Sequence, residues 1–174
     1  MAAVRKVWAQ LIPIAGGALA SQARAFERAG VEGVWAPQMF GAPFATLAAV
    51  APATSTLKLG TGIALAFVRS PLETACNAID LDLISGGRVV LGLGSSAQSQ
   101  IEGSFGSPYG KPLAHMAEIV SMIRAIAAKR SRIAGQRSPI TASRRSICAT
   151  SRASALAGKP PRYRPPSRGA ISPP

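Results

Sequence analysis

The first 127 residues repeat one pattern four times: a short apolar segment typical of a buried strand, followed by a segment whose apolar residues have helical spacing. The repeat length is close to the roughly 30 residues of a strand–helix–strand crossover unit. Strands joined by such helices run parallel, with right-handed connections. The pattern predicts an α/β fold. Two architectures satisfy it, an open doubly wound sheet and the first half of a TIM barrel, and periodicity does not distinguish between them.

Proline, glycine and capping residues bound the segments of this repeat. Strands are expected at residues 4–12, 33–36, 57–65 and 88–93, and helices at residues 19–29, 44–50, 71–85 and in the stretch that follows Pro112. The clearest boundary is Ser70-Pro71-Leu72-Glu73, a capping-box pattern with proline at the first helical position. On this helix, the apolar stripe expected to face the protein core consists of Leu72, Cys76, Ile79 and Leu83.

Charge divides the chain near residue 127. Residues 1–127 hold nine Lys or Arg and all seven Asp or Glu, whereas residues 128–174 hold eleven Lys or Arg and no acidic residue. The C-terminal segment mixes Arg, Ser, Ala and Pro and has few large apolar residues, so it cannot bury enough surface to offset its ordering entropy. We therefore expect a disordered basic tail. Such a tail could bind nucleic acid non-specifically through phosphate contacts, although only Tyr163 is available for base stacking.

Several features favour a cytoplasmic protein. Residues 5–20 resemble a signal peptide, but Gln10 and Pro13 interrupt the apolar run, and these residues suit a strand, a turn and a helix start. No stretch reaches the roughly 18 uninterrupted apolar residues that a membrane helix needs. Cys76 and Cys148 have neither metal-ligand nor disulfide-framework spacing. A reducing compartment is the simpler interpretation, and no metal site is expected.

A glycine-rich segment, Gly92-Leu93-Gly94-Ser95-Ser96, follows the fourth strand. It invites comparison with the dinucleotide-binding fingerprint, but position 97 is alanine where the third glycine should stand. The acidic residue expected further on is missing too, so we reject a Rossmann site. Two interpretations stay open: the small residues allow a tight turn at the strand end, or they form the wall of a cofactor site.

The segment before this strand identifies a family. Residues 81–88 read Leu-Asp-Leu-Ile-Ser-Gly-Gly-Arg and lead into the strand at 89–94. They resemble the luciferase-like family of flavin- or deazaflavin-dependent oxidoreductases, whose members carry D-x-x-S-x-G-R before a G-x-G strand. Three flanking stretches resemble this family in the same order: residues 59–64, 69–71 and 105–112. The resemblance covers about residues 4–126. It implies a TIM barrel with FMN or a deazaflavin, coenzyme F-420, at the carboxyl ends of the strands.

The resemblance also implies where the cofactor ring binds. The matching positions are Gly62, Ile63 and Ala64 in the third strand, Gly94, Ser95 and Ser96 after the fourth strand, and Gln38 after the second strand. In the family the first group is a bulge that often contains a non-prolyl cis peptide. Without the family in view, an ordinary strand glycine at a bulge would be the first interpretation. The neutral amide of Gln38 could hydrogen-bond a ring edge but could not act as a general base.

No catalytic residue is assigned, because the chain departs from the family pattern after the fourth strand. Basic, aromatic and amide residues are expected there ahead of a glutamate, whereas this chain has residues 97–101 before Glu102. Glu102 is most simply a solvated loop carboxylate. His115, the only histidine, is most simply a half-exposed structural residue at a helix start.

The length of the chain is the larger departure. A TIM barrel takes about 250 residues, and its phosphate site usually comes from the loops after strands seven and eight. A half barrel leaves two unpaired strand edges and an uncovered apolar face, which predicts a homodimer, instability or aggregation. We hypothesise that residues from about 128 onward are an out-of-frame reading of a GC-rich gene. The expected function is hydride transfer or oxygen activation on a small-molecule substrate, in a truncated and inactive product.

Overall fold

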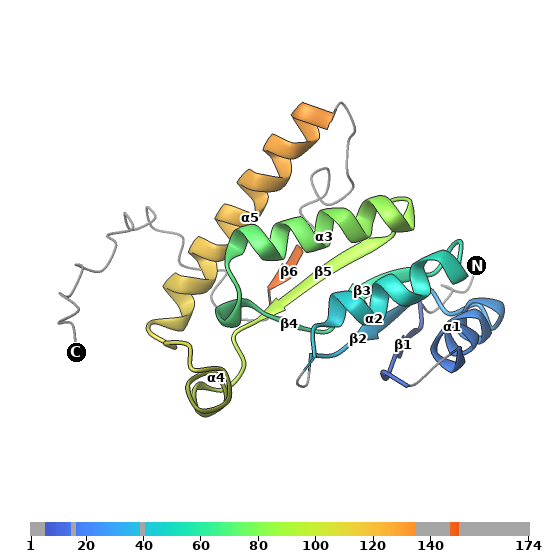
Figure 1. The fold of residues 1–174 in the computed structure, drawn as a ribbon, viewed down its shortest axis with the longest axis horizontal. Helices are drawn as coiled ribbons and strands as arrows, with labels where there is room; N and C mark the ends of the chain where they lie inside the picture. The colour runs from blue at the N-terminus through green and yellow to red at the C-terminus, as the bar shows by residue number, and fades with distance from the viewer. Residues whose placement is uncertain (1–5, 15–16, 39–40, 135–146, 150–174) are drawn as a thin grey trace, which may run out of the picture.

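The computed structural model describes residues 6–14, 17–38, 41–134 and 147–149, which form a parallel sheet and a layer of helices (Figure 1). The strands are β1 (Trp8–Gln10), β2 (Gly33–Ala36), β3 (Lys58–Thr61), β4 (Ala64–Leu65), β5 (Val89–Gly94) and β6 (Ile147–Ala149). The helices are α1 (Ala18–Arg28), α2 (Pro43–Val50), α3 (Pro71–Ser85), α4 (Gln98–Phe105) and α5 (Pro112–Ala134). Two 3₁₀ turns, η1 (Ala51–Ala53) and η2 (Ala66–Val68), follow α2 and β4.

The order of the strands decides between the two predicted architectures. β1 pairs with β2, β2 with β3, and β3 with β5, all in parallel. Leu93 of β5 has Ala64 of β4 and Ala149 of β6 as partners, so these two strands lie on opposite sides of β5. Apart from β4, each later strand of the chain is therefore added at the same edge of the sheet. A doubly wound sheet reverses its order at a switch point, so the uninterrupted order is that of a TIM barrel.

The helices cover one face of this sheet (Figure 1). α1 packs against α2, α2 against α3, and α3 against α5, so neighbours in sequence are neighbours in space. On α5 the buried side chains include Met116, Ile119 and Ile123, which share one helical face. The core is formed by the buried side chains of these helices and by strand residues such as Leu59 and Leu91, both completely buried.

The register places two stacked tryptophans over glycines of neighbouring strands. Trp8 lies opposite Gly33, and Trp35 lies opposite Gly60. The two rings have centroids 4.2 Å apart and planes inclined by 22°. A Cβ added to Gly33 would lie 2.6 Å from the Trp8 ring, and one added to Gly60 would lie 2.2 Å from the Trp35 ring. These glycines therefore leave the space that the indole rings fill.

The ends of α3 confirm the predicted capping signals. Pro71 is the first helical residue, and the Ser70 hydroxyl accepts a hydrogen bond from the Glu73 amide at 3.0 Å. At the other end Gly86 takes a left-handed conformation with φ of 68°, which favours glycine because a Cβ would be strained there. The helix therefore begins and ends where these local signals direct.

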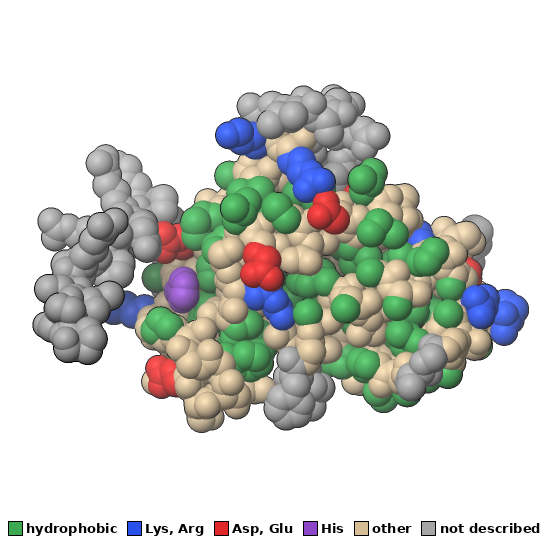
Figure 2. Space-filling view, in the orientation of Figure 1, with side chains coloured by type: hydrophobic (Ala, Val, Ile, Leu, Met, Phe, Trp, Pro, Cys, Tyr) green, Lys and Arg blue, Asp and Glu red, His purple; other side chains and the backbone are tan. Residues whose placement is uncertain are grey.

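The apolar stripe predicted for α3 is wrong at both ends. Leu72 and Leu83 are 58% and 62% exposed. The buried positions of the helix are mostly small or polar: Thr74, Ala75, Ala78, Ile79, Leu81, Asp82 and Ser85. The helix therefore buries a face of mostly small side chains, and Leu72 and Leu83 lie on its solvent side. Apolar side chains are accordingly spread over the surface of the helical layer in Figure 2.

Two elements lie where the sequence predicted a loop and a tail. Residues 98–105, expected as a loop after the fourth strand, form α4, which buries Ile101 completely and ends at Gly106 with φ of 63°. α5 continues past the expected boundary at residue 127 to Ala134, because alanine, lysine and arginine extend a helix without large apolar residues. Beyond it, β6 pairs with β5. The rest of the expected basic tail lies outside the described residues.

Candidate functional site

A break in strand pairing marks the carboxyl end of β3. β3 and β4 are separated by Gly62 and Ile63, and the peptide bond between these two residues is cis, as the resemblance implied. The Gly62 amide donates to the Ala36 carbonyl at 2.9 Å, which ties the break to the end of β2. Gly62 is exposed and Ile63 is half-buried. The break thus presents an exposed backbone and an apolar side chain.

Just before this break, the Thr61 side chain takes the place of backbone hydrogen bonds between β3 and β5. Its hydroxyl donates to the Gly92 carbonyl at 2.7 Å and accepts from the Gly92 amide at 2.8 Å. Thr61 is completely buried, and a Cβ on Gly92 would lie 2.2 Å from the Thr61 carbonyl oxygen. The side chain of one strand therefore bonds the backbone of the next, and glycine is required for the close approach.

The end of β5 supplies two hydroxyl groups. Ser95 and Ser96 are half-buried, and Ser96 has φ of 58°, in the left-handed region that serine rarely adopts. The Ser96 hydroxyl donates to the side-chain oxygen of Gln100 at 2.6 Å. Among the described residues, the Ser95 hydroxyl has only long contacts of 3.4 Å, to the Ser96 carbonyl and the Tyr109 hydroxyl. Ser95 is therefore the better placed of the two to bind a ligand.

Gln38 connects the end of β2 to β4. Its side-chain oxygen accepts from the Leu65 amide and from the Arg69 guanidinium, both at 2.9 Å. Leu65 in turn pairs with Gly94 of β5, so Gln38 belongs to the same end of the sheet as the other predicted site residues. Burial lowers the pKa of Arg69, and the nearby Glu73 opposes that shift. The Gln38 oxygen is thus occupied within the protein, and the side chain is buried.

Sequence reasoning missed Tyr109. It lies between α4 and α5, and its hydroxyl donates to the Ser96 carbonyl at 2.9 Å. Its ring meets Phe67 of η2 edge-on, with centroids 5.4 Å apart, and His115 stacks on Phe67 at 4.4 Å. His115 is half-buried, in agreement with the structural role expected for it, and Glu102 is exposed on α4. Tyr109 lies in the stretch 105–112 that resembles the family, but nothing local singles it out, because its partners Ser96 and Phe67 are distant in sequence.

The segment that identified the family lies at the opposite end of β5. The Arg88 guanidinium donates to the carbonyls of Ala51, Leu57 and Ser85 at 2.8, 2.9 and 2.6 Å, and to the Thr54 hydroxyl at 2.9 Å. The Ser85 hydroxyl bonds the Asp82 carbonyl and the Arg88 amide. This segment therefore fastens α3 and η1 to the amino ends of β3 and β5. Its role is structural.

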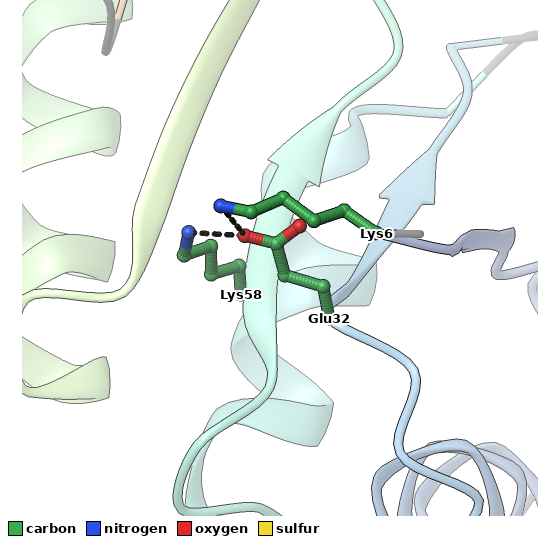
Figure 3. Close-up of polar contacts among 3 residues, drawn as sticks. All are labelled: Lys6, Glu32 and Lys58. Carbon is green, nitrogen blue, oxygen red and sulfur yellow. Dashed lines mark hydrogen bonds and ion pairs between the residues drawn. The ribbon is translucent and has the colours of Figure 1, made fainter. Parts of the chain in front are cut away.

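Two glutamates complete the amino end of the sheet. Glu27 of α1 accepts the backbone amides of Ser55, Thr56 and Leu57 at 2.6–3.0 Å, and the bond from Thr56 is the main cause that lowers its pKa to about 2. Glu32 accepts from Lys58 at 2.6 Å and from Lys6 at 3.3 Å (Figure 3). The Lys58 hydrogen bond lowers the pKa of Glu32.

The described part of the chain contains no helix that is both long and apolar enough to cross a membrane. Within the same residues no three His, Cys, Asp or Glu side chains gather as a metal site would require. Most of the basic tail lies outside the described ranges, so nucleic-acid binding stays a prediction. The homodimer stays a prediction as well.

The family model for luciferase-like monooxygenases matches residues 6–174. The chain belongs to this family. The match runs to residue 174, beyond the residues 4–126 on which the sequence resemblance rested. The matched range includes β6, which pairs with β5 as the next strand of the sheet.

Individual relatives match a shorter stretch. An uncharacterised protein of Mycobacterium tuberculosis is 43% identical over 107 residues, which cover 62% of this chain and 32% of that protein. A putative coenzyme F420-dependent oxidoreductase of the same organism is 34% identical over 110 residues, 63% of this chain and 32% of its own length. The chain thus spans about a third of the length of these curated relatives.

A solved structure shows the same fold. The coenzyme F420-dependent tetrahydromethanopterin reductase of Methanopyrus kandleri superposes with a TM-score of 0.58 at 25% identity. The superposition covers 70% of this chain and 39% of the reductase. The open sheet order therefore corresponds to part of a luciferase-like barrel.

Proposed function

We propose that this chain contributes the ring-binding part of a luciferase-like oxidoreductase. The cofactor would be a deazaflavin or FMN, held at the carboxyl ends of β3, β4 and β5. The similarity to F420-dependent relatives supports a deazaflavin. When bound, either cofactor supplies hydride transfer, and FMN can also activate oxygen. The protein's own task is to hold the ring and orient a small-molecule substrate.

The observation that carries this proposal is the break at Gly62 and Ile63, which leads into β4, together with the turn at Ser95 and Ser96, which follows β5, the strand that pairs with β4. The first offers exposed backbone and an apolar side chain, which suit the face of a flat ring. The second offers hydroxyl groups, which suit the polar edge of the ring. The chemistry of these residues therefore fits a flavin-like ring. Carboxyl ends of barrel strands are also where barrel active sites lie.

Ala64, Gly94 and Gln38 complete the proposed site. Ala64 pairs with Leu93, one residue before the buried Gly94, so β4 and β5 are in contact where the ring would bind. The amide nitrogen of Gln38 would donate to a ring carbonyl or nitrogen. Because an amide does not titrate, Gln38 would orient the ring without moving a proton.

Ligand titration tests the proposal directly. The 174-residue protein is titrated with FMN and, separately, with the deazaflavin coenzyme, and quenching of cofactor fluorescence is followed. We expect saturable quenching by at least one cofactor. Ser95→Ala should weaken binding about 3- to 10-fold, the value of one hydrogen bond. Ser99→Ala, at an exposed position of α4, is the matched control and should bind normally. Absence of saturable quenching with both cofactors would refute the proposal.

A further inference from the structure

Tyr109 contacts the segments that follow two neighbouring strands at the proposed ring site, β5 and β4. Its hydroxyl donates to the Ser96 carbonyl at 2.9 Å and lies 3.4 Å from the Ser95 hydroxyl. Its ring packs edge-on against Phe67, with centroids 5.4 Å apart. Ser95 directly follows β5, and Phe67 belongs to η2, which directly follows β4. A single side chain therefore joins the ends of two neighbouring strands.

The turn that Tyr109 contacts needs such support. Ser96 occupies the left-handed backbone region with φ of 58°, which costs a non-glycine residue free energy. Two hydrogen bonds hold it there: its own hydroxyl bonds Gln100 at 2.6 Å, and its carbonyl accepts from Tyr109. The first bond is local to the start of α4. The Tyr109 bond is the one that reaches the turn from a distant segment.

We propose that Tyr109 is a positioning residue for the cofactor ring. Its hydroxyl holds the Ser95–Ser96 turn in the conformation that binds the polar edge of the ring, and its own ring keeps the turn at a fixed distance from η2. Tyr109 does this without touching the cofactor. The inference rests on the proposed function. It extends the site to the segment between α4 and α5.

Tyr109→Phe isolates the hydroxyl, because phenylalanine keeps the ring and its packing against Phe67. We expect the Kd for the cofactor that the unchanged protein binds to rise about 5- to 20-fold. The melting temperature without cofactor should change little, since Tyr109 is partly exposed. The absorption band of the bound cofactor should also shift, because the hydrogen bonds at the ring edge change.

Ser85→Ala is the matched control at the other end of the sheet. It removes a hydroxyl that bonds the Asp82 carbonyl and the Arg88 amide, so it should lower the melting temperature and leave Kd unchanged. A second measurement uses the unchanged protein: hydrogen–deuterium exchange at residues 94–97 and 107–110 should slow together when cofactor binds.

The outcomes separate the two proposals. If the unchanged protein binds neither cofactor, the proposed function fails and the inference fails with it. If it binds but Tyr109→Phe binds with the same Kd and the same absorption band, only the inference is overturned. Protection at residues 94–97 without protection at 107–110 would overturn it as well, whether or not the variant folds.

Discussion

The two ends of the parallel sheet use polar side chains in different ways. At the amino ends, Arg88 and Glu27 each bond three or more groups of the protein at 2.6–3.0 Å. At the carboxyl ends, Ser95 has only long contacts, and Gln38 uses only its oxygen. Hydrogen-bonding capacity that the fold does not use is available to a ligand. Under the proposed function, the amino end serves stability and the carboxyl end binds the ligand, as in other barrels.

The comparison has a measurable form. Variants at the amino end should lower the free energy of unfolding and leave the cofactor Kd unchanged. Ser95→Ala and Tyr109→Phe should raise the Kd and leave the free energy of unfolding nearly unchanged. The contact of Thr61 with Gly92 joins β3 to β5 and is shared by both strands.

The largest effect is expected at this shared contact. In Gly92→Ala the added Cβ would lie 2.2 Å from the Thr61 carbonyl oxygen, which belongs to the backbone and cannot rotate away. We expect a loss of more than about 3 kcal/mol in the free energy of unfolding, or failure to fold. Urea unfolding measures it. Gly103→Ala on α4, where a Cβ meets nothing within 4 Å, should be stabilising by about 0.5–1 kcal/mol. A fully stable Gly92→Ala protein would contradict the close approach of β3 and β5.

Arg88→Met should have the next largest effect. It leaves the carbonyls of Ala51 and Leu57 without their donor, and we expect a loss of about 2–3 kcal/mol. Arg124→Met, at an exposed position of α5, controls for the loss of a charge. Urea unfolding and cofactor titration are run on the same samples. A changed Kd with unchanged stability would reverse the assignment of the two ends.

Glu27→Gln tests the amino end through pH. The pKa of Glu27 lies at about 2 in the folded protein, against 4.5 as its ordinary value, so the folded state favours the carboxylate. Its contribution is complete above about pH 4.5 and is lost as pH falls toward 2. Because the group is partly exposed, we expect the variant to lose only about 1 kcal/mol at neutral pH. Its stability should also vary less between these pH values than that of a Glu118→Gln control. Parallel pH profiles would argue against this role.

Lys58→Gln should have the smallest effect. Lys58 and Glu32 form an exposed ion pair (Figure 3), and such pairs contribute little. We expect a small decrease in the urea midpoint at low salt that disappears at about 1 M salt, where the Debye length is about 3 Å. A salt-independent decrease would show that the pair acts through packing instead.

Local signals predicted much of the fold. The capping residues of α3, the positive φ at Gly86 and the four crossover units follow from neighbours in sequence, and the structure confirms them. The exposure of Leu72 and Leu83 could not be predicted this way, because the closeness of α3 to its neighbours depends on residues of other elements. The role of Arg88 was hidden for the same reason: its partners lie more than 30 positions away, except for Ser85.

Some residues of the candidate site were likewise predicted from the sequence, and others were found only in the structure. The glycine-rich segments at Gly62 and Gly94 stood out in the sequence as strand ends with small residues, and the resemblance joined them into one site. The structure brings Gln38 to the same end through its bond to Leu65. It also adds Tyr109, whose contacts with Ser96 and Phe67 have no signature in the local sequence.

The sequence by itself determined most elements up to α5, with α4 as the exception, the parallel direction of the strands and the family, because these depend on periodicity, on turn residues and on a contiguous segment. Tertiary structure decided the strand order, which periodicity left open and the resemblance only implied. It also decided which polar groups bond one another within the protein. These bonds depend on distances between groups far apart in the chain, which no local pattern encodes.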